Sequence, residues 1–205
     1  MKTRRPILVV EDVPDTLELI KVTLNFNGYE VITARNGEEA LKIIQRQRPA
    51  LIITDVLMPY VDGFSLVQRI RLDPTTRNIP VVFLSATYIA PEDKEFAASI
   101  GVTRFLEKPI VMDEFLRTVK ELLSSGLPAD SKPLEMRKFY HGYRQRLENK
   151  LKQKLSQIAR TEAMMAALSE QERQAFQATL EKAREERDEI QALLEQIRRQ
   201  LEESA

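Results

Sequence analysis

Cysteine is absent from this chain of 205 residues, which excludes disulfides and thiolate metal sites. No apolar run approaches the ~20 residues that span a bilayer. After the charged start, only four apolar residues precede Glu11 and Asp12, which is too short a run for a signal peptide. We therefore expect a cytoplasmic protein with no membrane partner.

An excess charge is also lacking, because 31 basic and 31 acidic residues cancel. The composition thus gives no general reason to expect nucleic acid as a partner. Proline does not occur after Pro133, and the sequence from residue 134 onward is rich in Glu, Gln, Lys, Arg, Leu and Ala. This shift predicts a domain over residues 1–124, a linker over 125–133 and a helical module over 134–205.

Short apolar runs alternate with helical patterns in the first part of the chain. The predicted strands cover about residues 7–10, 29–33, 51–54, 80–84 and 103–106. The predicted helices cover about residues 17–27, 36–47, 63–72 and 112–123, with another after Pro91. Five such units in a row predict an α/β fold with a parallel sheet covered on both faces.

Polar residues follow the predicted strands at the points where they end. Glu11 and Asp12 follow the first strand, Asp55 the third, Ser85 the fourth and Lys108 the fifth. Ligands bind beyond the carboxyl ends of such strands. Three carboxylates brought together repel unless a cation joins them, and oxygen ligands without His or Cys favour Mg²⁺. One carboxylate can then attack phosphorus, while the metal, an ammonium and a hydroxyl compensate the phosphoryl charge.

In these residues the segment 5–123 resembles the receiver domain of bacterial two-component response regulators. The matching elements are Glu11-Asp12, the run Thr54-Asp55-Val56-Leu57-Met58-Pro59, Gly63, Ser85-Ala86 and Lys108-Pro109. The resemblance implies a flavodoxin-like fold with strand order 2-1-3-4-5, and a peptide bond before Pro109 that is commonly cis. It also implies a phosphorelay, with a histidine kinase or phosphotransfer protein as donor.

The resemblance also implies a role for each residue of the cluster. Asp55 is the expected phosphoacceptor, and Mg²⁺ is held by Glu11, Asp12, Asp55 and the backbone carbonyl of Leu57. Ser85 and Lys108 contact the phosphoryl group once it arrives. Phe105 is the expected aromatic switch, which turns inward as Ser85 moves and changes the face of the fourth helix, fifth strand and fifth helix.

Simpler interpretations exist for each of these residues taken alone. Glu11, Asp12 and Asp55 are also good helix caps, Lys108 is an ordinary surface lysine, and Phe105 is an ordinary core residue. The sequence has no nucleotide-binding loop of the form G-x-x-x-x-G-K-S/T. We therefore expect no enzyme activity beyond the protein's own phosphorylation and dephosphorylation.

Apolar residues in the helical module recur at steps of three and four. The cleaner series is Phe176, Leu180, Ala183, Arg187, Ile190, Leu194, Ile197 and Leu201, which is typical of a coiled-coil seam. Ser169 and Glu172 match a capping box that interrupts the seam. The pattern predicts two helices, about 134–168 and 170–203, folded as a hairpin; one uninterrupted helix is the alternative.

Charge is divided between the two predicted helices. Residues 132–160 hold nine basic and two acidic side chains, and residues 161–205 hold six basic and eleven acidic ones. Opposite signs favour a hairpin, and two hairpins complete a core, so we predict a homodimer through residues 134–203. The module then serves dimerisation and docking of a downstream protein. Two alternatives remain: phosphotransfer through His141, the only histidine, and nucleic-acid binding by the basic helix 132–160.

Overall fold

A computed structural model describes residues 5–86, 91–125, 136–166 and 168–203 of the chain. The chain divides into two compact units, residues 1–134 and 135–205, and each is described by itself. Most of the predicted linker 125–133 lies outside the described residues. The first unit alternates strands and helices in the order β1 (Ile7–Val10), α1 (Pro14–Phe26), β2 (Val31–Ala34), α2 (Gly37–Arg46), β3 (Leu51–Asp55), α3 (Gly63–Leu72), β4 (Val81–Ser85), α4 (Pro91–Ser99), β5 (Arg104–Glu107) and α5 (Met112–Ser125).

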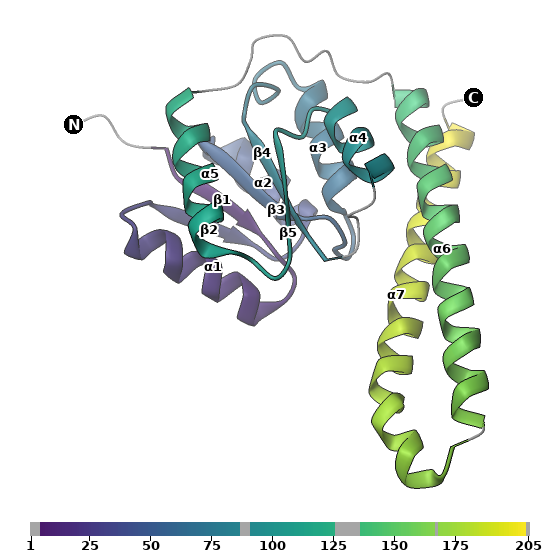
Figure 1. The fold of residues 1–205 in the computed structure, drawn as a ribbon. Helices are drawn as coiled ribbons and strands as arrows, with labels where there is room; N and C mark the ends of the chain where they lie inside the picture. The colour runs from purple at the N-terminus through teal and green to yellow at the C-terminus, as the bar shows by residue number, and fades with distance from the viewer. Residues whose placement is uncertain (1–4, 87–90, 126–135, 167, 204–205) are drawn as a thin grey trace. The chain divides into compact units, whose positions relative to one another are not determined.

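The five strands form one parallel sheet in the order β2-β1-β3-β4-β5, which confirms the predicted topology (Figure 1). Neighbouring strands are in register up to their carboxyl ends. Val10 pairs with Thr54, and Asp55 pairs with Leu84 on the next strand. Because the strands are parallel and aligned, the residues that follow them emerge at one edge of the sheet.

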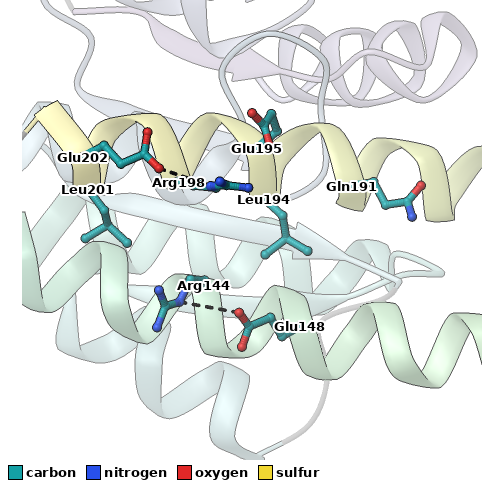
Figure 2. A pocket seen from close by; sticks show the side chains of 8 residues that line it. All are labelled: Arg144, Glu148, Gln191, Leu194, Glu195, Arg198, Leu201 and Glu202. Carbon is teal, nitrogen blue, oxygen red and sulfur yellow. Dashed lines mark hydrogen bonds and ion pairs between the residues drawn. The ribbon is translucent and has the colours of Figure 1, made fainter.

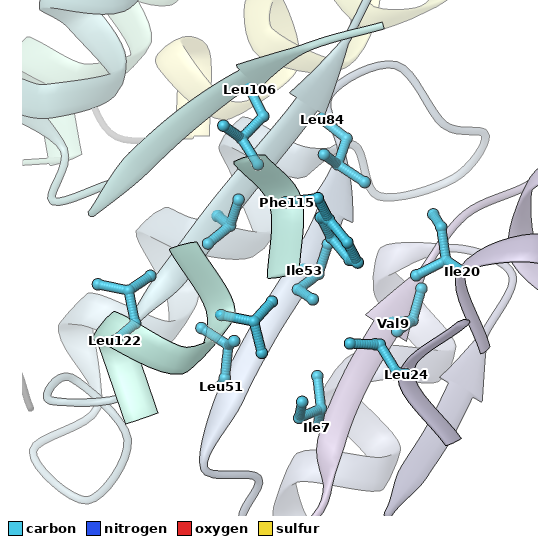
Figure 3. Close-up of a cluster of buried hydrophobic side chains, with 12 residues drawn as sticks. Ile7, Val9, Ile20, Leu24, Leu51, Ile53, Leu84, Leu106, Phe115 and Leu122 are labelled. Atoms are coloured by element: carbon cyan, nitrogen blue, oxygen red, sulfur yellow. The ribbon is translucent and has the colours of Figure 1, made fainter. Parts of the chain in front are cut away.

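One face of the sheet packs against α1 and α5 (Figure 3). Its core consists of buried aliphatic residues and one phenylalanine, namely Ile7, Val9, Ile20, Leu24, Leu51, Ile53, Val82, Leu84, Leu106, Phe115, Val119 and Leu122. The other face is covered by α2, α3 and α4 (Figure 1). There Phe64 packs edge-on against Phe83, with ring centroids 5.1 Å apart, and against Phe96 at 5.3 Å. The central strands are thus buried on both sides, as their apolar runs predict.

The observed elements differ from the predicted ones mainly where a strand starts. β2 begins at Val31 rather than at the predicted Tyr29. The backbone N–H of Tyr29 donates instead to Leu24 O at 3.1 Å, beside Gly28 with its positive φ of 80°. These bonds close the end of α1, so Tyr29 belongs to the helix terminus and the strand starts later.

A buried arginine joins two loops at the amino-terminal edge of the sheet, the α3–β4 loop and the α4–β5 loop. Arg71, near the end of α3, is 1% exposed, and its guanidinium donates to the backbone carbonyls of Arg77, Ile79 and Gly101 at 2.7–3.2 Å. Burial lowers the pKa of Arg71 to about 10. Gly101 has a φ of 92°, and a Cβ there would lie 2.7 Å from Arg71 Nε. Glycine at this position therefore lets the guanidinium approach the loop between α4 and β5.

The second unit is a helical hairpin of α6 (Met136–Ala166) and α7 (Glu170–Glu203), which lie side by side (Figure 1). Ile158 of α6 clusters with Leu180 and Ala183 of α7. Ion pairs also link the helices, with Lys154 2.5 Å from Glu186 and Glu162 2.6 Å from Arg184. The predicted pair of helices is confirmed, and the alternative of one uninterrupted helix is wrong.

The break between the two helices lies where the capping pattern predicts it. The guanidinium of Arg173 donates to Met165 O at 3.0 Å, across the turn. The side chain of Glu172 is outside the described set, so the capping box of Ser169 and Glu172 stays a prediction. Among the described residues, no helix is long and apolar enough to cross a membrane.

Candidate functional site

Five polar residues lie together at the edge of the sheet formed by the carboxyl ends of the strands. Glu11 and Asp12 directly follow β1, Asp55 is the last residue of β3, Ser85 is the last of β4, and Lys108 directly follows β5. Carboxylate oxygens of Glu11, Asp12 and Asp55 lie within 4.8 Å of one another. Residues far apart in the sequence therefore form one acidic cluster, because the parallel register brings the strand ends together.

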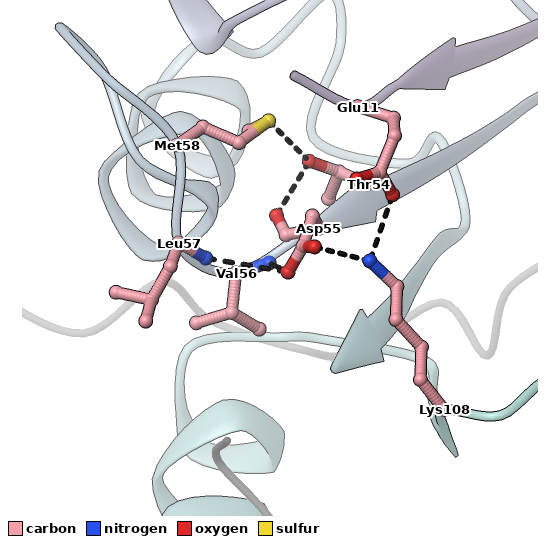
Figure 4. A network of polar contacts seen from close by, with 7 residues as sticks. All are labelled: Glu11, Thr54, Asp55, Val56, Leu57, Met58 and Lys108. Carbon is pink, nitrogen blue, oxygen red and sulfur yellow. Dashed lines mark hydrogen bonds and ion pairs between the residues drawn. The ribbon is translucent and has the colours of Figure 1, made fainter. Parts of the chain in front are cut away.

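The ammonium of Lys108 is bonded to two of these carboxylates (Figure 4). Its Nζ lies 2.9 Å from Glu11 Oε2 and forms a second ion pair with Asp55 Oδ2. The Lys108 side chain is 18% exposed, that of Glu11 1% and that of Asp55 14%. The ion pairs are largely shielded from water, so removal of one partner would leave a charge that is costly to keep unpaired.

Backbone groups hold the second oxygen of Asp55. The N–H groups of Val56 and of Leu57 donate to Asp55 Oδ1, the latter at 3.3 Å. Gly63 N donates to Val56 O at 2.8 Å and closes the loop that leads to α3. A Cβ at Gly63 would lie 2.3 Å from the backbone oxygen of Asp55, so only glycine allows this approach.

Helix capping does not account for the three carboxylates. The N-cap of α1 is Val13, which makes no side-chain capping bond, and Pro14 follows it. The N-cap of α3 is Asp62, whose carboxylate accepts the backbone N–H of Ser65 at 3.1 Å. Glu11, Asp12 and Asp55 thus lie outside the caps, which leaves their clustering with Lys108 as the feature to explain.

Burial and neighbouring charges shift the pKa values of Glu11, Asp12 and Lys108. Burial, together with the charge of Asp55, raises the pKa of Glu11 above its ordinary value, although Lys108 opposes this. Burial and Asp55 also raise the pKa of Asp12. Burial alone would lower the pKa of Lys108, but the charge of Asp55 and the bonds to Asp55 and Glu11 outweigh it and raise that pKa. The site therefore carries more negative charge than one ammonium compensates.

The donor set fits a hard divalent cation. Glu11 Oε1 is a buried oxygen without a hydrogen-bond partner in the described part of the chain. It belongs to a carboxylate whose neighbours Asp12 and Asp55 also offer oxygens within 4.8 Å. Oxygen ligands alone suit Mg²⁺ rather than zinc or copper. The role of the Leu57 backbone carbonyl as a metal ligand stays a prediction.

The predicted switch residues lie on β4 and β5. Ser85 is buried, and its backbone oxygen accepts the N–H of Lys108 at 3.0 Å. Phe105 is half-buried and packs edge-on against Phe83, with ring centroids 6.1 Å apart. The peptide bond between Lys108 and Pro109 is cis, as the resemblance implies. The role of the Ser85 hydroxyl toward a phosphoryl group stays a prediction.

Sequence reasoning missed Lys94, which contacts Phe105, the predicted switch residue. Its Nζ, on α4, lies 5.8 Å from the ring centroid of Phe105 and 2.7 Å from Glu107. An exposed lysine in the first turn of a helix carries no sequence signal for such a contact. The neighbouring pair of Arg104 with Glu121, at 2.9 Å, joins β5 to α5. Together these contacts tie the three elements of the predicted switching face.

The structure of the hairpin does not distinguish the two alternative functions, phosphotransfer through His141 and nucleic-acid binding by the basic helix. His141 is exposed on α6, as are Lys138, Arg144, Lys152 and Arg160 of the same helix. Exposure is compatible with phosphotransfer and with nucleic-acid binding but favours neither. Both alternatives stay predictions.

The sequence matches that of known proteins over the first unit. The sequence model described as the response regulator receiver domain matches residues 7–120. The polar-differentiation response regulator DivK of Brucella anthropi is 32% identical over 122 residues, which are 60% of this chain and 98% of DivK. The response regulator PleD of Caulobacter vibrioides is 40% identical over 104 residues, but these are only 23% of PleD and 51% of this chain.

Solved structures agree with the sequence comparison. The receiver domain of sensor histidine kinase PA1611 from Pseudomonas aeruginosa PAO1 was solved with a magnesium ion coordinated in its active site cleft. It is similar to this chain with a TM-score of 0.55 and 30% identity, over 59% of this chain and 98% of that domain. The hairpin lies beyond the residues that the family model matches.

Proposed function

Because the chain belongs to the response regulator receiver family, we propose that it accepts a phosphoryl group on Asp55 from a histidine kinase or phosphotransfer protein. One observation carries this proposal. The Lys108 ammonium is bonded to both Glu11 and Asp55, with Asp12 in the same cluster. A partly buried group of three carboxylates and one cation at the ends of parallel strands suits phosphoryl transfer better than it suits a structural role.

The transfer needs few catalytic groups. A carboxylate oxygen of Asp55 forms a bond to phosphorus, and the bond from phosphorus to the donor's imidazole nitrogen breaks. The leaving imidazole keeps the electron pair of that bond and takes up a proton. Lys108 compensates charge on the phosphoryl oxygens, and the Ser85 hydroxyl donates to one of them.

Magnesium is the cofactor that the acidic cluster favours. Glu11, Asp12 and Asp55 would hold it, together with the predicted carbonyl of Leu57. When bound, the ion neutralises charge shared between the carboxylates and the phosphoryl oxygens. The unpartnered Glu11 Oε1 and the raised pKa values of Glu11 and Asp12 support this assignment, as does the magnesium ion in the similar PA1611 domain.

Phosphorylation would act on the face formed by α4, β5 and α5. The new group adds about −1.5 to −2 of charge near Lys108 and Ser85. As Ser85 turns toward it, Phe105 gains room to rotate inward and leaves its contact with Lys94. The group thus selects between two arrangements of this face, which is a shift of populations.

Labelling with a small acyl phosphate, such as acetyl phosphate, tests the acceptor. With Mg²⁺, we expect intact mass spectrometry to show one added phosphoryl group, which hydroxylamine removes. Asp55→Asn should show none, whereas Asp113→Asn, at an exposed carboxylate on α5, should label like the unaltered protein. Label retained in Asp55→Asn would disprove the assignment.

We further propose that the hairpin makes the protein a homodimer and presents a docking surface to a downstream protein. The seam of α7 follows coiled-coil spacing, and a two-helix hairpin alone buries little apolar surface. Light scattering on the full chain, with and without beryllofluoride and Mg²⁺, would reveal the dimer and its response to the phosphorylated state. Asp55→Asn is the control that should not respond. A chain that is monomeric throughout would remove the dimer but leave the phosphoacceptor untouched.

A further inference from the structure

A groove runs between the two helices near the open end of the hairpin (Figure 2). It has a volume of about 630 Å³. Leu194 and Leu201, seven residues apart on α7, form its apolar floor, and Arg144 and Glu148 lie opposite on α6. Both leucines are only half-buried. A pair of leucines at heptad spacing, open to solvent, is typical of a helix that has a further packing partner.

The same face of α6 continues toward the closed end with Leu151 and Leu155. Positions 144, 148, 151 and 155 follow steps of four and three, so they share one side of the helix. Leu151 is half-buried, and Leu155 is 45% exposed. We call the groove with Leu151 and Leu155 the docking face. It presents leucines from both helices on one side of the hairpin.

Charges of both signs border the docking face. Arg144 pairs with Glu148 at 3.5 Å on α6, and Arg198 pairs with Glu202 at 3.2 Å on α7. All four side chains are 44–71% exposed. A leucine centre with both signs of charge on its rim allows the surface to pack against a second copy of itself, as in a two-fold interface between identical subunits.

The two helices differ in net charge. Residues 136–166 hold eight basic and two acidic side chains, whereas residues 170–203 hold six basic and ten acidic ones. If two hairpins pair with α6 beside α6, like charges face each other. If α6 of one copy lies beside α7 of the other, opposite charges face each other. Charge therefore favours the second arrangement.

We propose that the docking face binds a second copy of this chain, with α6 of each subunit next to α7 of its partner. This inference rests on the proposed dimerisation of the hairpin and specifies its surface. In the resulting four-helix bundle, Leu151, Leu155, Leu194 and Leu201 of both copies lie in the shared core. Each basic helix then has two acidic neighbours, one in its own chain and one in the partner.

Leu155→Gln in the full chain tests the surface. Its side chain is already half-exposed in the hairpin, so the helix content by circular dichroism should not change. Burial of two such leucines per dimer is lost, and we expect the dimer dissociation constant to rise about 30-fold. Met164→Gln is the matched control, because Met164 is 46% exposed but points to the opposite side of α6.

Charge reversal tests the pairing of α6 with α7. A chain with Arg144→Glu and a chain with Glu195→Lys and Glu202→Lys should each dimerise more weakly than the unaltered chain. Mixed together, they should form a heterodimer preferentially, which analytical ultracentrifugation with one labelled chain detects.

The outcomes separate the proposals. An unaltered chain that stays monomeric overturns both the dimer and its surface. A dimer that Leu155→Gln does not weaken overturns the docking face alone. A Leu155→Gln effect without preferential heterodimers overturns the pairing of α6 with α7.

Discussion

Replacing Lys108 by methionine should destabilise the first unit in the absence of divalent cations. The ammonium pairs with Glu11 and Asp55, whose side chains are 1% and 14% exposed. Removing one partner of a buried ion pair leaves uncompensated charge and costs roughly 3–5 kcal/mol. Because the Lys108 side chain is 18% exposed, we expect the lower end, about 3 kcal/mol less free energy of unfolding at neutral pH.

The loss should depend on pH in a defined direction. Without Lys108, the pKa of Glu11, already raised by burial and by Asp55, rises further, because Lys108 lowers it. The folded variant then binds more protons than the unfolded chain between the ordinary pKa of 4.5 and the raised one. Stability increases as the pH falls through that window. The deficit of Lys108→Met should therefore shrink as the pH falls from neutral toward 4.5.

Magnesium should restore much of the lost stability. An ion that binds only the folded state stabilises it by about 2.7 kcal/mol at a hundred times its dissociation constant. Lys108→Met should gain more from Mg²⁺ than the unaltered chain does, because no ammonium competes for the carboxylates. Urea unfolding followed by circular dichroism measures both effects, and the transition that Mg²⁺ shifts belongs to the first unit.

The control is Lys120→Met, at an exposed lysine on α5, which should change little. The reasoning fails if Lys108→Met lowers the free energy of unfolding no more than Lys120→Met does. It also fails if the deficit grows, rather than shrinks, on acidification.

Four further changes have defined outcomes. Gly63→Ala should cost about 3 kcal/mol in urea unfolding and abolish acyl-phosphate labelling, because its Cβ would collide with the backbone of the acceptor loop. Arg71→Met should lower the free energy of unfolding by about 3 kcal/mol, because the buried carbonyls that the guanidinium binds lose their hydrogen-bond donor. Mg²⁺ affinity, measured by NMR titration, should weaken on acidification earlier than for ordinary carboxylates, because the pKa values of Glu11 and Asp12 are raised. Leu57, half-buried and apolar, cannot orient an attacking water, so the phosphorylated protein should persist far longer than seconds, and Leu57→Asn should shorten its lifetime.

The topology and the site's location were open to prediction because they depend on local patterns. A buried strand shows itself as a short apolar run, and the residue after it is known once the strand is known. Parallel alignment then places Asp12, Asp55 and Lys108 at one edge without knowledge of any loop. The contact between Lys108 and two carboxylates follows from that placement together with opposite charge.

Other features depend on contacts that leave no mark in the local sequence. Arg71 was not singled out, because its partners are backbone carbonyls, and any residue can supply those. β5 is an edge strand whose Arg104 and Glu107 are exposed, so its pattern is less apolar than that of the central strands. Lys94 meets Phe105 only because α4 packs beside β5. These are tertiary contacts, and periodicity does not report them.

The guanidinium of Arg71 has a mechanical consequence for the switching face. It donates hydrogen bonds to the carbonyl of Gly101, just past the carboxyl end of α4, and to the carbonyl of Ile79 in the loop that leads into β4. The end of α4 is thereby joined to that loop. In the first turn of α4, Lys94 contacts Glu107 and Phe105 of β5. Because this buried arginine fixes the loop that follows α4, we expect the last turn of the helix to act as a pivot and to move less than its first turn during signalling.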